Sequence, residues 1–169
     1  MNGRAVYYLY FGLDASPRGA AMALTDALES EGLRPALTQA DRGRLITTHS
    51  EQGAPMTALR LFVNDGYFDA DHGGQELLSA YPIVAECGNE ATIDTFDERV
   101  RQIFITVARR LAWPTIQTGV RGELVAAFLP HFGYGDFGSK DITPDSPRER
   151  WEPWTDPGPW PTVTDELEP

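Results

Sequence analysis

Side chains that could do chemistry are few in this chain of 169 residues, which has one cysteine and three histidines. A cysteine nucleophile needs a base within hydrogen-bond reach, so a catalytic Cys87 requires His49, His72 or His131 to meet it in space. Cys87 ends an apolar run just before Gly88, where a free cysteine usually packs as a small hydrophobe. The sequence therefore favours a structural cysteine. A single cysteine also excludes an internal disulfide framework and a multi-cysteine zinc site.

A group of carboxylates between residues 65 and 76 is the second candidate. It consists of Asp65, Asp69, Asp71 and Glu76, with His72 among them. A calcium loop of the EF-hand type needs oxygen ligands at fixed positions around a central glycine, and no register starting at Asp65 or Asp69 supplies them. Asp and Gly are also the residues that turns prefer. We therefore predict a turn-rich loop over 66–74, with no metal ion and no cofactor.

The segment GYGDFGSK, residues 133–140, matches the pattern G-x-G-x-x-G through Gly133, Gly135 and Gly138. A dinucleotide or phosphate loop must lead directly into the N-terminus of a helix. Here Pro144 follows soon after, and the lysine comes after the serine, whereas a P-loop has the lysine first. These neighbouring residues argue against a phosphate site. We predict instead a flexible glycine-rich exit segment after the last strand.

The C-terminal stretch 141–169 has a different composition, with seven of the 13 prolines, three of the four tryptophans, and eight acidic residues against two basic ones. Two interpretations are open: the indoles pack partly back on the domain, or they anchor a partner, as aromatic residues often do at interfaces. Carboxylates beside them would steer a basic partner. The candidate partner-binding residues are Trp151, Glu152, Trp154, Asp156 and Trp160.

Residues 1–140 are expected to form the single domain that positions these groups. Apolar and β-branched runs bounded by turn residues predict strands at 5–13, 33–40, 44–50, 57–65, 81–88 and 123–130.

Two helices are expected from apolar stripes at spacings of three and four. The first starts at an N-cap, Ser16, followed by Pro17, and ends near Gly32, which suits a left-handed cap. The second starts at a capping box, Thr95 to Glu98, and ends at Trp113-Pro114. The predicted buried stripes are Ala20, Ala21, Leu24, Ala27 and Leu28 in the first helix and Phe96, Val100, Ile103, Phe104, Val107 and Leu111 in the second. A short helix over 75–80 is also expected.

The fold class that follows is α+β: a two-layer protein with a mainly antiparallel sheet of about five or six strands and two main helices packed on one face. The Pro- and Trp-rich tail, 141–169, is expected to pack partly on the domain 1–140.

Charge and hydropathy exclude several classes of function. A net charge of -11 with a sequence pI near 4.6 disfavours nucleic acid as a partner, since phosphates repel an acidic surface. No apolar run is long enough to cross a membrane, and the tyrosine-rich N-terminus is typical of a strand, not of a signal peptide. We therefore expect a cytoplasmic protein.

Small size and surplus acid favour a protein that binds and neutralises or regulates a protein partner, as an immunity protein or antitoxin does. The alternative is a small enzyme or small-molecule-binding domain. Its pocket would use His49, Asp69, Asp71, His72, Cys87 and His131. Mimicry of DNA charge is a weaker third interpretation, because the 12 basic residues of the body interrupt a phosphate-like array.

Overall fold

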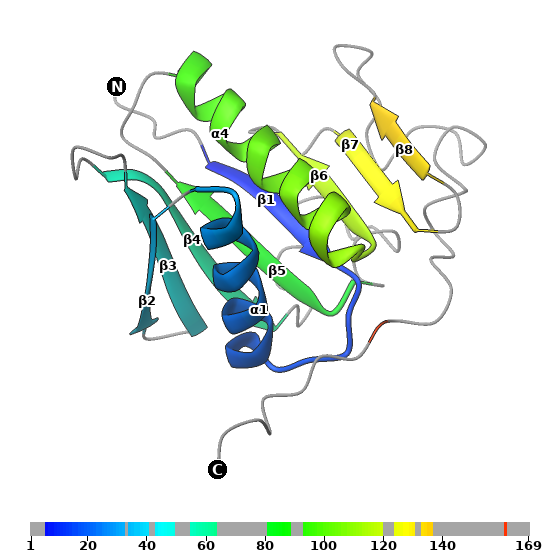
Figure 1. Cartoon of the computed structure of the whole chain (residues 1–169). Helices are drawn as coiled ribbons and strands as arrows, with labels where there is room; N and C mark the ends of the chain where they lie inside the picture. Colours follow the sequence, from blue (N-terminus) through cyan, green and yellow to red (C-terminus); the bar gives the residue numbers. More distant parts are fainter. Residues whose placement is uncertain are drawn as a thin grey trace.

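The computed structural model describes residues 6–32, 34–40, 43–49, 55–63, 81–88, 93–119, 124–130, 133–136 and 161. Within these ranges the chain forms one eight-stranded sheet with helices on one face (Figure 1). The strands are β1 (Val6–Phe11), β2 (Arg34–Ala40), β3 (Gly43–His49), β4 (Pro55–Val63), β5 (Ile83–Gly88), β6 (Thr115–Thr118), β7 (Leu124–Leu129) and β8 (Gly133–Asp136). The helices are α1 (Pro17–Ser30), α4 (Ile93–Thr106) and a π-helical continuation of α4, η1 (Val107–Leu111).

The strand order is β2-β3-β4-β5-β1-β6-β7-β8, and every neighbouring pair is antiparallel. The crossovers through α1 (β1 to β2) and α4 (β5 to β6) therefore each join two parallel strands. Such crossovers are right-handed in nearly all proteins. Because β1 and β5 run in opposite directions and their crossovers leave in opposite directions, the same handedness puts both helices on one face (Figure 1).

Helix α1 forms as its end signals predict. The side chain of Ser16 accepts a hydrogen bond from the Gly19 N–H at 3.0 Å, and Pro17 occupies the first turn. At the other end, Gly32 adopts a φ of 84°, in the left-handed region that favours glycine. All five residues of the predicted stripe are buried. This helix packs over β2, β3 and β4.

Helix α4 is amphipathic as predicted, but its two ends differ from the sequence expectation. It begins at Ile93, so Thr95 lies inside the first turn and is not the predicted N-cap. Its last turn widens into η1, where the N–H of Ala112 donates to the Val107 carbonyl five residues earlier at 2.9 Å. Trp113 then packs edge-on against Phe11, with ring centroids 5.4 Å apart. Of the predicted stripe, Val100, Ile103, Phe104 and Val107 are buried and Leu111 is partly buried.

The main core lies between the sheet and the helices. Alternate residues of the two central strands face the helices because side chains switch sides at every residue of a strand. These are Tyr7, Leu9 and Phe11 of β1, and Ile83, Ala85 and Cys87 of β5, all in one buried cluster with the helix stripes. We call the opposite side the helix-free face.

The predicted class is correct, but the predicted number of strands, five or six, is too low. The six predicted strands are present with ends within two residues of the expected positions. The two additional strands, β6 and β8, carry weak local signals: β6 is polar at three of four positions and β8 contains two glycines. Both form because the neighbouring strands supply hydrogen-bond partners, which overrides weak propensity.

Residues 133–136 are therefore not the flexible exit that the sequence predicted. Gly133 and Gly135 pair with Leu129 and Ala127 of β7, and only the remainder of the glycine-rich segment, 137–140, lies outside the described residues. Also outside are the predicted loop 66–74 and the predicted short helix 75–80. None of the helices in the described part of the chain is both long and apolar enough to cross a membrane.

Candidate functional site

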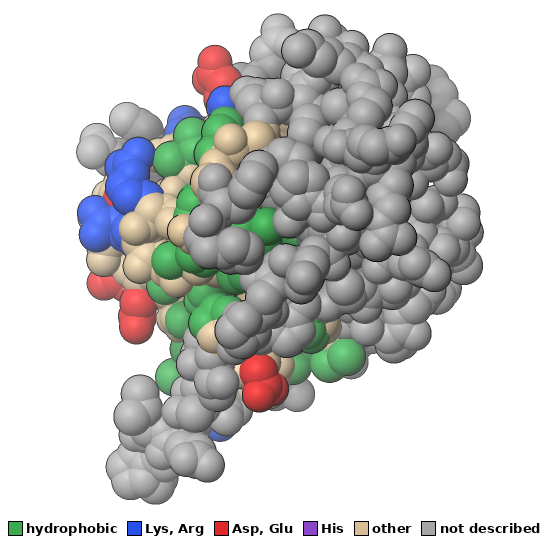
Figure 2. Space-filling model, turned by 90° about the vertical axis from the view of Figure 1, so that its right-hand side faces the viewer, with side chains coloured by type: hydrophobic (Ala, Val, Ile, Leu, Met, Phe, Trp, Pro, Cys, Tyr) green, Lys and Arg blue, Asp and Glu red, His purple; other side chains and the backbone are tan. Residues whose placement is uncertain are grey.

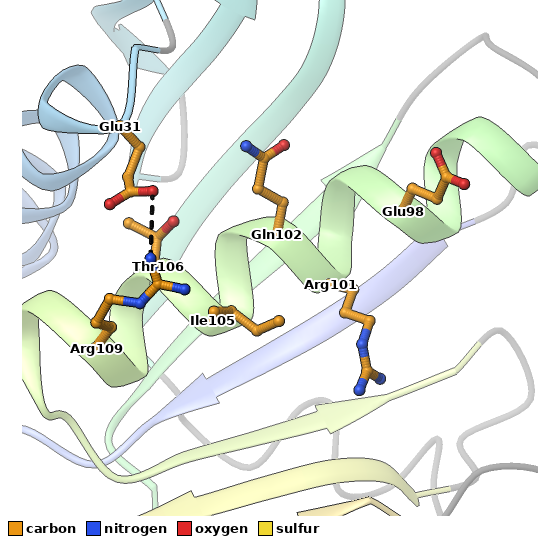
Figure 3. A pocket seen from close by; sticks show the side chains of 7 residues that line it. All are labelled: Glu31, Glu98, Arg101, Gln102, Ile105, Thr106 and Arg109. Atoms are coloured by element: carbon orange, nitrogen blue, oxygen red, sulfur yellow. Dashed lines mark ion pairs between the residues drawn. The ribbon is translucent and has the colours of Figure 1, made fainter.

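The surface most capable of specific contacts runs across α4, from the end of α1 to the edge strand β8. We call it the α4 strip, and it consists of Glu31, Glu98, Arg101, Gln102, Arg109 and Tyr134. A shallow hollow of about 340 Å³ lies along it, and Ile105 and Thr106 also line this hollow. Figure 3 shows that six of the seven lining side chains come from α4 and η1 and that Glu31 approaches from α1.

Arg101 and Tyr134 form one end of the α4 strip. The Arg101 Cζ atom lies 5.7 Å from the centroid of the Tyr134 ring, within the range of a cation–π contact. The Tyr134 ring also packs on Phe104 of the core, with centroids 5.6 Å apart in an edge-to-face arrangement. Arg101 points away from Glu31 (Figure 3). Tyr134 nevertheless keeps 44% of its surface exposed, so a rigid aromatic ring with an arginine over it faces solvent.

Glu31, the C-cap of α1, forms the other end of the α4 strip. It accepts a hydrogen bond from Arg110 Nε and makes an ion pair with Arg109, Nη1 to Oε1 3.8 Å. A π-helix has more residues per turn than an α-helix, so consecutive side chains differ less in direction. This is why two consecutive arginines can reach the same carboxylate. This contact ties the ends of α1 and α4 together across the surface.

The hydrogen bond from Arg110, with the positive charges of Arg110 and Arg109, holds the pKa of Glu31 below its ordinary value of 4.5. A carboxylate with a lowered pKa stabilises the folded chain at neutral pH, and this contribution is lost as the pH falls through the folded pKa. We therefore expect the melting temperature of the wild type to fall more steeply below about pH 4.5 than that of Glu31→Gln. Thermal unfolding between pH 3 and pH 7 measures it. The matched control, Glu29→Gln on the same helix, should keep the steep wild-type fall; parallel curves for Glu31→Gln and wild type would contradict the assignment.

Charges on α4 and η1 follow the direction of the helix. Glu98 lies in the second turn of α4, and arginines follow at 99, 101, 109 and 110. This order suits the helix dipole, which favours anions at the N-terminus and cations at the C-terminus. Figure 2 shows Lys/Arg and Asp/Glu side chains side by side on the helical layer, at the left of the view. The α4 strip thus presents both signs of charge, not a uniformly acidic surface.

Cys87 lies inside the core and not in the α4 strip. It is fully buried, and its Sγ atom has a weak contact to the Ala85 carbonyl at 3.9 Å. Burial, and to a lesser extent the nearby charge of Glu86, raises the pKa of the thiol. A protonated, inaccessible thiol is not a nucleophile, so the structure bears out the structural interpretation of this residue.

The other predicted chemical groups are not brought together by the part of the chain that the structure describes. His49 ends β3 and only its backbone is described, while His72, His131, Asp69 and Asp71 lie outside the described residues. Among the described residues, no three His, Cys, Asp or Glu side chains gather in a way that could hold a metal ion. The predicted partner-binding residues of the tail also lie outside: Trp151, Glu152, Trp154, Asp156 and Trp160 stay predictions.

Sequence reasoning missed the α4 strip. Nothing local in the sequence indicates that Tyr134 approaches Arg101, because β8 is brought near α4 only by the strand order. One signal was available: Tyr134 is an aromatic residue between glycines, which offer it no side chains to pack on, so its ring has to find a partner elsewhere in the fold.

The sequence matches no protein-family model, and no curated protein is significantly similar to it. The class that the fold and the site define is thus an antiparallel α+β protein with a mixed-charge, Arg- and Tyr-bearing surface across its second helix.

Proposed function

We propose that this protein binds a protein partner and inhibits or regulates it, in the manner of an immunity protein or an antitoxin. The observation that carries the proposal is the Arg101–Tyr134 pair of the α4 strip. Tyrosine and arginine are enriched at protein interfaces and dominate binding energy where they are rigidly held. Here the Tyr134 ring contacts both Phe104 and the Arg101 guanidinium, and these contacts restrict its motion, so less side-chain entropy is lost on binding.

The distribution of charge supports a basic partner. The described ranges hold eight basic and nine acidic residues, so almost all of the net charge of -11 resides in the rest of the sequence, which includes Glu152 and Asp156. Such a field accelerates the encounter with a basic protein more than it strengthens the final complex. In this proposal the α4 strip makes the specific contacts with the partner, and the acidic segments speed up the encounter with it.

The alternative, a small enzyme or a small-molecule-binding domain, has less support. Of the six groups that it would use, Cys87 is the one whose side chain the structure describes, and that thiol is buried and protonated. Cytoplasmic location and the tail contacts remain predictions.

Binding to the partner tests the proposal. We expect the tagged full-length chain to retain one protein in stoichiometric amount, and the double variant Arg101→Ala, Tyr134→Ala to bind that protein at least about tenfold more weakly, the loss of one interface hot spot. The control is Val63→Ala, an exposed residue on β4 with 57% of its surface accessible, which should bind as the wild type does. Circular dichroism checks that each variant is folded.

A second pair of substitutions tests the steering. Glu152→Gln with Asp156→Asn should slow association at low salt and leave dissociation unchanged. Recovery of no stoichiometric protein, or equal binding by the Arg101, Tyr134 variant and the control, would refute the proposed function.

A further inference from the structure

The helix-free face of the sheet has buried side chains of its own. Six residues there have no exposed surface, and we call them the covered face: Tyr10, Val84, Ile116, Thr118, Ala127 and Leu129. Their register places them side by side on the adjacent strands β5, β1, β6 and β7, opposite the helices. None of the described helices or strands lies on this face (Figure 1). A side chain on a sheet face is buried only where something packs on it.

The buried part of the helix-free face ends near β5. Farther along the same face, on β4, Arg60 is exposed and Ala58 and Phe62 are half-buried. On β5, Glu86 is half-buried as well. Whatever covers this face therefore extends over β1, β6 and β7 and stops near β5.

The C-terminal segment is fixed at both ends of that region. The backbone N–H of Asp14, just beyond β1, donates to the carbonyl of Pro161 at 2.8 Å. At the other end, Asp136 closes β8 and pairs with Ala126 of β7. Residues 137–160 connect these two described points, one on the edge strand and the other at the end of the central strand β1.

The distance is short for that length of chain. Asp136 of β8 pairs with Ala126 of β7, which pairs with Gln117 of β6, which in turn pairs with Leu9 of β1. Asp136 is therefore at the same height in the sheet as Leu9, three strands away. With about 4.8 Å between strands and about 3.3 Å per residue along them, the diagonal to Asp14 is roughly 22 Å. The 24 residues 137–160 span it easily. On the helical side α4 lies over these strands (Figure 1), and its Phe104 packs on Tyr134 of β8. None of the described helices or strands obstructs the diagonal across the covered face.

We propose that residues 137–160 cross the helix-free face over β7, β6 and β1, with the indoles of Trp151, Trp154 and Trp160 packed on the covered face. The sequence suits this geometry. Proline-rich segments favour the polyproline II helix, which has about three residues per turn. In that conformation Trp151, Trp154 and Trp160 share one side of the helix, and Glu152 and Asp156 lie on its two other sides. Each indole buries about 150–250 Å² when packed. The tryptophans then complete a second core, and the carboxylates stay in solvent, available to the partner.

Hydroxyl-radical footprinting of the full-length chain, read residue by residue by mass spectrometry, tests this proposal without any partner. In the wild type we expect Trp151, Trp154 and Trp160 to be oxidised several-fold more slowly than in the urea-unfolded chain. Ala127→Arg, on the covered face, should restore their reactivity. Ala58→Arg, on the same face but beyond its boundary, should leave them protected.

The reciprocal variant covers the case in which Ala127→Arg does not fold. Trp151→Ala with Trp154→Ala should make Tyr10 and Leu129 reactive, while Phe62, outside the covered face, keeps its wild-type rate. The proposal is overturned if the three indoles of the wild type react as in the unfolded chain. It is equally overturned if Tyr10 and Leu129 stay protected in the tryptophan variant, since another segment such as 64–80 then covers them, or if protection depends on protein concentration, since a second copy then does.

Discussion

Replacing Leu9 by alanine is expected to destabilise the fold by about 2–5 kcal/mol, the range for truncating a buried leucine. Leu9 has no exposed surface and stands at the centre of β1, paired with Ala85 on one side and Gln117 on the other. Its side chain lies in the cluster between the sheet and both helices. Removing it leaves a cavity that the surrounding strands cannot close, because both neighbours are held in register.

Urea denaturation followed by far-ultraviolet circular dichroism measures the difference. Leu37→Ala is the matched control, because it removes the same atoms from the edge strand β2, where 37% of the leucine surface is already in water. Leu37→Ala should lower the free energy of unfolding by less than half as much as Leu9→Ala does. Equal losses at the two positions would mean that β1 is not at the centre of the core.

The second large effect is the protection of Cys87 from thiol reagents. Modification of a fully buried thiol requires unfolding or a large opening of the sheet. With stabilities of about 5–15 kcal/mol typical of small proteins, the native rate should be lower than the unfolded rate by on the order of 10³-fold or more. Because burial raises the pKa of this thiol, raising the pH to 9 should not restore reactivity while the chain is folded.

Labelling with an aromatic disulfide reagent, with and without urea, gives both rates. Cys87→Ser serves as the blank for non-specific signal. Rapid stoichiometric labelling of the folded protein would contradict the buried position and revive the enzyme alternative, in which this cysteine acts as a nucleophile.

Local signals in the sequence were sufficient to predict both main helices. Ser16 with Pro17 specifies where α1 begins, and Gly32 where it ends, because caps act through hydrogen bonds within a few residues. Apolar spacing predicted the buried stripes of both helices. The end signals of α4 were less reliable: Thr95 is a residue type that often caps helices, but it lies inside the first turn because the helix already begins at Ile93.

Strand content was predicted only where the strands are apolar. β6 escaped prediction because Thr115, Gln117 and Thr118 are polar, yet all three are buried in the structure between β1 and β7. β8 escaped because glycine has low strand propensity. A strand takes its hydrogen bonds from neighbours that are distant in sequence, so a weak local pattern does not exclude it.

Periodicity, caps and a lone thiol in an apolar run are local properties, so the α+β class, the two helices, six of the strands and the structural role of Cys87 could be predicted from the residues alone. The strand order depends on long-range packing, and so do the pairing of Arg101 with Tyr134 and the convergence of Arg109 and Arg110 on Glu31. These contacts join residues 33, 78 and 79 positions apart in the chain. Only the folded sheet and its packed helices bring such residues together, because no local preference of the backbone carries information over that separation.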